Sequence, residues 1–202
     1  ISYPSFQVSD TVSAANGGTF AGNVAMSGTL GVTGATTLSS TLGVTGKITS
    51  TAGITFGSDT SADNVLSDYE EGTWTPTLDF NTGASSVAYS ERKGTYTKVG
   101  RLVTVMGVIV LTSKGSGGSG RVQITGLPFN CSTATGSNQY SGTVEARFVT
   151  LSSEAIHAEI GRSANNMVRI MRSQSGAQVA EITEANCANN TGFLFTITYE
   201  EA

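Results

Sequence analysis

Between Gly22 and Phe56 the chain carries all its large apolar residues at even-numbered positions and none at odd-numbered positions. Because successive side chains of an extended chain point to opposite faces, this parity places the apolar residues on one face and a series of threonines on the other. Every third even position is small, so a small residue recurs every six residues, as at Gly28 and Gly34. We call this segment the apolar ladder, and its spacing predicts short extended stretches separated by tight bends at the small residues.

A ribbon with one apolar face cannot bury that face alone, so the ladder requires partners. A helix is disfavoured because the hydrophobic period is not 3.6 or 3.5 residues. A left-handed β-helix made by one chain also uses six-residue repeats, but the ladder supplies only about two three-sided coils. Three parallel chains share one apolar axis, and we therefore predict an intertwined homotrimeric β-stalk. Its predicted core is Val24, Met26, Leu30, Val32, Leu38, Leu42, Val44, Ile48, Ile54 and Phe56.

Composition predicts an all-β fold and argues against two classes of partner. Charged residues make up only 13% of the 202 residues, glycines number 25, and runs of helix-favouring residues are missing. The formal net charge of −4 disfavours binding to nucleic acid. No apolar run approaches the roughly 20 residues of a membrane span, so we expect no membrane insertion. The chain begins at Ile1 without Met or a signal peptide, and we expect a processed product or a C-terminal piece of a longer protein.

The pattern along the chain predicts four segments. They are an N-terminal arm over residues 1–19, the β-stalk over 20–57, an acidic connector over 58–75 and a head domain over 76–202. Short strands punctuated by Gly, Ser and Asn predict an antiparallel, jelly-roll-like β-sandwich for the head, with its connectivity left open. A hairpin is expected at Gly100-Arg101, followed by a strand over 102–111 that is buried on both faces. Further strands are expected over 121–124, 144–149, 155–160, 167–171, 178–182 and 193–199.

Residue types that carry catalysis are sparse, and we predict that the chain is not an enzyme. His157 is the only histidine, and no nucleophile elbow accompanies it, so a Ser-His-acid triad is not expected. A glycosidase would need two carboxylates about 5 to 10 Å apart in a cleft, and a solubilising charge is the simpler interpretation of each acidic residue in the head. Those available for such a pair are Glu145, Glu154, Glu159, Glu181 and Glu184.

Metal ions and organic cofactors are not expected either. Cys131 and Cys187 lie in no CxxC or His-paired spacing, so we predict free thiols, with a bridge only if the fold brings their Cα atoms within about 7 Å. Asp59, Asp63 and Asp68 of the connector match no EF-hand spacing, and a solvated acidic turn is favoured over a cation site. The chain is therefore predicted to work without a cofactor.

Polar loops of the head supply groups suited to contact with a ligand. Amides pair with sugar hydroxyls and tyrosine offers a flat face, although asparagine also favours turns for conformational reasons alone. Trp74, at the junction of connector and head, is predicted to be a buried anchor rather than a sugar platform. We favour the loop over residues 132–140. The candidate receptor-binding residues are Asn130, Asn138, Gln139, Tyr140, Asn165, Asn166, Asn189 and Asn190.

Three motifs occur in a fixed order after the ladder. They are the run Leu66-Ser67-Asp68-Tyr69-Glu70-Glu71-Gly72-Thr73-Trp74-Thr75-Pro76, the run Gly94-Thr95-Tyr96-Thr97-Lys98-Val99-Gly100-Arg101-Leu102-Val103, and the run Thr125-Gly126-Leu127-Pro128-Phe129. With the preceding repeats, such as Thr29-Leu30-Gly31-Val32-Thr33-Gly34, this series resembles the head region of tailed-bacteriophage tail fibres and tailspike-like proteins over about residues 20–130.

The resemblance implies a trimeric virion fibre whose distal head binds the host surface. The expected function is that of a tail fibre adhesin for a bacterial polysaccharide or outer-membrane protein during adsorption. A tailspike-type glycan depolymerase and a structural spacer or virion decoration are the alternatives. The expected location is the phage tail after synthesis in the host cytoplasm, with other tail proteins bound through a missing N-terminal region. Host and receptor are not identified by the sequence.

Overall fold

The computed structural model describes residues 24–57, 65–66, 68–81, 83, 85–132, 139–152, 154–161, 166–173 and 176–202. The chain divides into two compact units, residues 1–48 and residues 49–202. The predicted N-terminal arm and the connector residues Asp59 and Asp63 lie outside the described residues. Within the described part the fold is all-β, with no α-helix and a single 3-10 helix, and no helix there could cross a membrane.

The described part of the first unit, residues 24–48, is an extended chain without hydrogen-bonded strands. Its backbone bends at residues 27–28, 33–34, 39–40 and 45–46, which matches the six-residue spacing of the small residues. The apolar side chains between the bends are exposed, as Leu30 at 69% and Leu42 at 66% illustrate. The predicted bends are therefore present, and the apolar face of the ladder is uncovered within one chain.

The second unit holds the described strands, which run antiparallel to their partners. The first two, β1 (Ile54–Thr55) and β2 (Val65–Leu66), pair with each other. Strand β3 (Tyr69–Trp74) begins within the segment expected to be the connector and already belongs to the main sheet. The other elements are β4 (Thr77–Asp79), β5 (Ala88–Val99), β6 (Leu102–Ser113), β7 (Gln123–Thr125), β8 (Tyr140–Val149), β9 (Ala155–Ile160), β10 (Met167–Ser173), β11 (Ala180–Glu181), η2 (Glu184–Asn186) and β12 (Cys187–Glu200).

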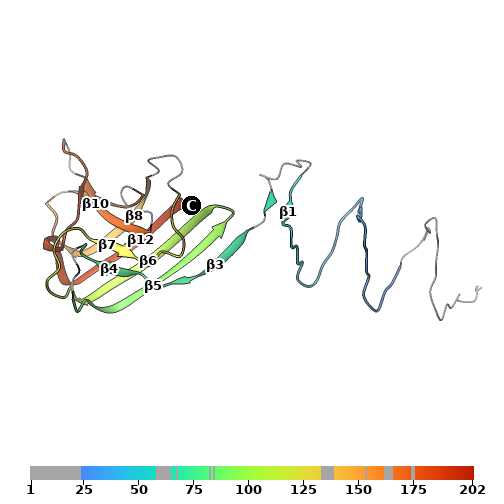
Figure 1. The fold of residues 1–202 in the computed structure, drawn as a ribbon, viewed down its shortest axis with the longest axis horizontal. Helices are drawn as coiled ribbons and strands as arrows, with labels where there is room; N and C mark the ends of the chain where they lie inside the picture. The colour runs from blue at the N-terminus through green and yellow to red at the C-terminus, as the bar shows by residue number, and fades with distance from the viewer. Residues whose placement is uncertain are drawn as a thin grey trace, which may run out of the picture. The chain divides into compact units, whose positions relative to one another are not determined.

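The main sheet has 10 strands in the order β3-β5-β6-β12-β8-β9-β10-β7-β4, with β11 paired to β10 (Figure 1). Strand β8 joins its two halves, because residues 140–142 pair with β9 whereas residues 143–149 pair with β12. The sheet curls so that both halves contribute to one core. We call the half made of β3, β5, β6, β12 and residues 143–149 of β8 the first layer.

Alternation of side chains along the long strands builds the core. In β6, Val103, Val105 and Ile109 are fully buried. In β12, every second side chain from Phe193 to Tyr199 is buried. They form one cluster with residues of β7, β9 and β10 in the other half of the sheet. The inner face of the first layer therefore packs on the second half, and its outer face points away from the core.

Several predicted elements are confirmed. Val99 pairs with Leu102, so the hairpin lies at Gly100-Arg101 as expected. The predicted antiparallel all-β head is also confirmed at this level, although the expected jelly-roll-like sandwich takes the form of one curled sheet. The expectation that residues 102–111 are buried on both faces is wrong, because Leu102 and Met106 on the outer face are 52% and 56% exposed.

Candidate functional site

The sequence motifs meet at one end of the first layer. This end, where β3 starts and β12 stops, is called the Tyr69 end. Lys98 is only 6% exposed there. Its ammonium group binds the carboxylate of Asp68 and lies 2.8 Å from Oε2 of Glu201. The hydrogen bond to Asp68, followed by that to Glu201, raises the pKa of Lys98. Lys98 thus ties the residues before β3 to the residues after β12.

Aromatic groups complete this junction. The ring of Tyr96 packs edge-on against Phe129 with a centroid distance of 5.3 Å, and its hydroxyl donates to Glu70, which raises the pKa of Tyr96. The fully buried Tyr199 donates its hydroxyl to the carbonyl oxygen of Phe129 at 2.8 Å, and burial raises its pKa. At this end the three motifs therefore supply contacts that hold the fold together.

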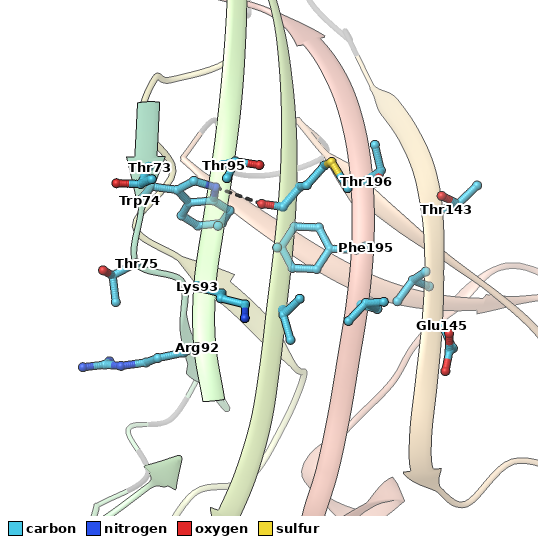
Figure 2. A pocket seen from close by; sticks show the side chains of 16 residues that line it. Thr73, Trp74, Thr75, Arg92, Lys93, Thr95, Thr143, Glu145, Phe195 and Thr196 are labelled. Carbon is cyan, nitrogen blue, oxygen red and sulfur yellow. Dashed lines mark hydrogen bonds between the residues drawn. The ribbon is translucent and has the colours of Figure 1, made fainter. Parts of the chain in front are cut away.

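Trp74 lies in a row of inward-facing residues that crosses the first layer. The row pairs Trp74 with Gly94, Gly94 with Gly107 and Gly107 with Phe195 on successive strands. The two rings lie over the two glycines and meet edge to face at 6.1 Å, and the indole Nε1 donates to the carbonyl oxygen of Met106 at 3.2 Å (Figure 2). Trp74 is 7% exposed, which confirms its predicted role as a buried anchor.

A groove of about 700 Å³ crosses the outer face of the first layer above this row (Figure 2). Its floor is the backbone of Gly94 and Gly107. One wall is a cross-strand row of Thr73, Thr95, Met106, Thr196 and Thr143, and the other is the row Lys93, Val108, Leu194 and Glu145. The groove thus has an apolar centre, with a cationic group on the β5 side and a carboxylate on the β8 side.

Exposed apolar side chains continue along this outer face beyond the groove. Parity of the pairing places Tyr69, Val99 and Leu102 on the same face as Met106. Among the described residues after the ladder, the exposed large apolar side chains all lie on this face except Phe148 and Val179. They are Tyr69, Val99, Leu102, Met106, Phe148, Val179 and Leu194. An apolar stripe therefore runs from the Tyr69 end to the middle of the sheet.

Some of the predicted binding residues gather at the Tyr69 end. Asn130 is exposed, and its carbonyl oxygen accepts a hydrogen bond from the amide of Ala202 at 3.1 Å. Gln139 is exposed, whereas the neighbouring Tyr140 is half-buried and packs edge-on against Tyr199 at 6.3 Å. Asn166 is exposed just before β10, whose first residue pairs with the last residue of β7. Asn138 and Asn165 lie outside the described residues.

The other two predicted residues lie at the opposite end of β12, which we call the Asn189 end. From Glu200 to Cys187 the strand advances only about ten sheet positions, because Gly192 and Cys187 pair with residues two apart in β8. At about 3.3 Å per residue, this end is roughly 30 Å from the Tyr69 end. Asn189 and Asn190 are exposed there, and the carboxamide oxygen of Asn189 accepts a hydrogen bond from the backbone amide of Lys114 at 3.1 Å. The ammonium group of Lys114 binds Glu184 and donates to the carbonyl oxygen of Cys187 at 3.0 Å. The predicted residues therefore divide between two separate surfaces.

Phe148 at the Asn189 end was not predicted from the sequence. It is 65% exposed and has a positive φ of 55°. Strand alternation would place this side chain toward the core, so the pattern of the sequence contains no signal for its exposure. Only the local backbone geometry reveals it.

The carboxylates considered for glycoside hydrolysis are held in ion pairs. Glu154 binds Arg172 at 2.9 Å, Glu181 binds Arg169 at 3.0 Å, and Glu145 binds Arg147 at 2.8 Å. Glu184 binds Lys114, and Glu159 lies 4.0 Å from Nε2 of His157. His157 stands on β9, with Met171 as its cross-strand partner. Each of these five carboxylates therefore lies within 4.0 Å of a basic side chain.

Both cysteines are buried free thiols, as predicted. The backbone of Cys131 forms an isolated β-bridge with Glu201, and the backbone of Cys187 pairs with Val149. The two cysteines therefore lie at opposite ends of β12 and cannot form a disulfide within one chain. Burial raises the pKa of Cys131, and it raises the pKa of Cys187 to about 11. Within the described residues, no group of three or more His, Cys, Asp or Glu is placed to hold a metal ion.

No protein-family profile and no curated protein sequence matches this chain. Among solved structures, its fold is similar to that of the Dettilon tailspike protein, with a TM-score of 0.51 and 17% sequence identity. The match covers 66% of this chain and 24% of the tailspike chain. At this level of identity the likeness is one of fold, and it shows that the all-β architecture of this chain also occurs in part of a tailspike protein.

Proposed function

We propose that this chain is part of a homotrimeric phage tail fibre and that its head is an adhesin for a bacterial surface polysaccharide or outer-membrane protein. The observation that carries the trimer is the exposure of the whole ladder, whose apolar side chains are 43% to 69% accessible in one chain. Burial of each contributes roughly 1 to 2 kcal/mol, so the ladder offers on the order of 10 kcal/mol per chain. Three parallel chains with bends in register would cover it.

The outer face of the first layer extends this contact to the head, with a second copy of the chain as its occupant. Its apolar stripe, which includes Tyr69, Val99, Leu102, Met106 and Leu194, would be buried in such a contact. The groove carries Lys93 on one side and Glu145 on the other. Each of these charges has a partner within the chain, Glu91 for Lys93 and Arg147 for Glu145, so the apolar stripe rather than the charges would drive the contact between copies.

The trimer is tested by a pair of adjacent substitutions in the ladder. Leu42→Asp places three carboxylates on a dry axis and is expected to yield monomer or aggregate, because a buried unpaired charge is costly. Thr41→Asp on the opposite face is expected to leave a trimer of about threefold the chain mass in sedimentation velocity. A Leu42→Asp protein that sediments as a stable trimer would contradict the shared axis.

Two observations support the adhesin. The fold is similar to part of a tailspike protein. The loops at the Asn189 end are rich in Ser, Gly and Asn, and we propose that this end meets the host. This choice moves the favoured receptor surface from the loop over residues 132–140 to Asn189 and Asn190.

Incubation with purified bacterial lipopolysaccharide or capsular polysaccharide separates the three functions. Retention of the polysaccharide without shortening supports an adhesin, and the paired state of Glu154, Glu181 and Glu184 makes this the expected outcome. Shortening of the polysaccharide, measured by size-exclusion chromatography, would instead support a depolymerase. If no polysaccharide and no bacterial cell is bound, the chain is a spacer and the proposed function is wrong.

A further inference from the structure

Strand β8 contains a single break in its alternation. Exposed and half-buried residues alternate from Tyr140 to Arg147, and the next residue, Phe148, should therefore face the core. Instead its backbone adopts a φ of 55°, and the ring is 65% exposed. Val149 then resumes the inward orientation and packs on the core. The left-handed residue thus turns one aromatic ring out to solvent and shifts the alternation of the strand by one residue.

The opposite strand is shaped around this residue. Cys187 pairs with Val149 and Gly192 with Arg147, so the four residues 188–191 of β12 bulge opposite Phe148 alone. The fully buried Thr191 anchors the bulge. Its hydroxyl donates to the carbonyl oxygen of Phe148 at 2.9 Å and accepts from the amide of Ala188 at 2.8 Å. The bulge is therefore a fixed feature that places the backbone of Asn189 and Asn190 opposite Phe148, while the carboxamide oxygen of Asn189 accepts from the amide of Lys114 and leaves its NH2 group as a donor.

Stability does not explain a phenylalanine at this position. Glycine adopts a positive φ without steric cost, whereas a bulky side chain in this region is a conformational outlier. The exposed ring gains little from burial, so the residue is held in an unfavourable conformation for small energetic return. Strained residues that persist in this way are concentrated at functional sites.

The groups that surround the ring suit a neutral sugar. An aromatic face attracts the polarised C–H bonds on one side of a pyranose ring, and carboxamides both donate to and accept from its hydroxyls. Nearby charges are already paired, with Arg147 bound to Glu145 and Lys114 bound to Glu184. We propose that Phe148, Asn189 and Asn190 form a saccharide-binding site in which a neutral hexose unit stacks on Phe148. This inference rests on the proposed adhesin and names its ligand class and contact residues.

The test uses the full chain on an array of bacterial O-antigen and capsular saccharides, together with binding to bacterial cells. Phe148→Gly is expected to lower saccharide binding by about tenfold or more while melting no lower than wild type, because strain is relieved as the platform is lost. Phe148→Tyr keeps a flat ring and is expected to bind within about threefold of wild type. Ser86→Gly is the matched control, since Ser86 has a φ of 62° and its replacement relieves a similar strain without removing a ring.

Each other outcome contradicts the site. Unchanged binding by Phe148→Gly, or a marked fall in its melting temperature, would show that the ring has no binding role or a structural one. Wild-type protein that binds cells but no saccharide would refute the sugar site while leaving the adhesin intact. Wild-type protein that binds neither cells nor saccharides would refute the proposed function itself.

Discussion

Replacement of Gly94 by alanine tests how the first layer is held together. A Cβ atom on Gly94 would lie 2.5 Å from Cε2 and 2.7 Å from Cδ1 of Trp74, so the indole has to move. Moving it breaks the hydrogen bond from Nε1 to the carbonyl oxygen of Met106 and the edge-to-face contact with Phe195. The substitution adds only one methyl group, yet it disturbs the whole cross-strand row.

The expected cost is about 2 to 5 kcal/mol of unfolding free energy. Overpacking of a well-packed core costs about 1 to 3 kcal/mol. Loss of the hydrogen bond adds about 1 kcal/mol, and loss of the aromatic contact adds about 0.5 to 1.5 kcal/mol. The gain from alanine over glycine in a strand returns about 0.5 to 1 kcal/mol. For a head of this size the melting temperature should fall by about 10 °C.

A double-mutant cycle isolates the clash. In a Trp74→Leu background the indole is absent, and Gly94→Ala is expected to cost close to nothing. Unfolding in urea is followed by far-ultraviolet circular dichroism, because Trp74 is the only tryptophan and the Leu variant has no tryptophan fluorescence. The protein concentration is held fixed, because the assembly is proposed to be oligomeric. Thr95→Ala, on the neighbouring outward position, is the control for a methyl-sized change on the same strand. An equal cost of Gly94→Ala in both backgrounds would refute the reasoning.

Two further predictions concern ionisable groups. Lys98→Met keeps the buried stem but removes the charge held between Asp68 and Glu201, and the substitution should lower the unfolding free energy by about 2 kcal/mol at pH 7. Because the pKa of Lys98 is raised in the folded state, the stability advantage of wild type over the variant should shrink as the pH rises above the ordinary pKa of 10.5. Urea unfolding at several pH values measures this difference. Cys187, whose pKa is about 11 when folded and 9.0 ordinarily, should remain unlabelled by a thiol reagent at pH 8 until the protein unfolds, and wild-type stability should fall between about pH 9 and 11 more than that of Cys187→Ala. Rapid labelling of native Cys187 would contradict its burial.

The parts of this fold that follow from side-chain periodicity were predictable. The recurrence of Gly28, Gly34 and Gly46 in the ladder predicted bends at a six-residue spacing. Glycine permits backbone conformations that other residues cannot adopt, so this signal can be read from the sequence alone. Trp74 was predictable as an anchor because an aromatic of its size gains most from burial. The hairpin at Gly100-Arg101 follows from turn chemistry in the same local way.

The parts that depend on pairing between distant strands were not predictable. The apolar run over residues 102–111 looked buried on both faces, but its outer face is uncovered in the single chain because no second layer lies over it there. Phe148 obeys strand alternation in the sequence, and its inversion depends on a bulge in β12 that lies some 40 residues away in the chain. The division of the candidate binding residues between two ends likewise depends on the direction of β12. Local patterns contain no information about these partners.

The central position of β12 has a consequence for how the protein is made. This strand lies between β6 and β8 and supplies Phe193, Phe195 and Ile197 to the core, yet it follows the other strands of the sheet in the chain. While residues 187–200 are still inside the ribosome, the edges of β6 and β8 have no partner, and an unpaired apolar edge promotes aggregation. Premature termination upstream of Cys187 would remove the middle of the sheet, so truncated products should be unable to form a head. The order of strands thus acts as a check that only chains translated through β12 form a complete head.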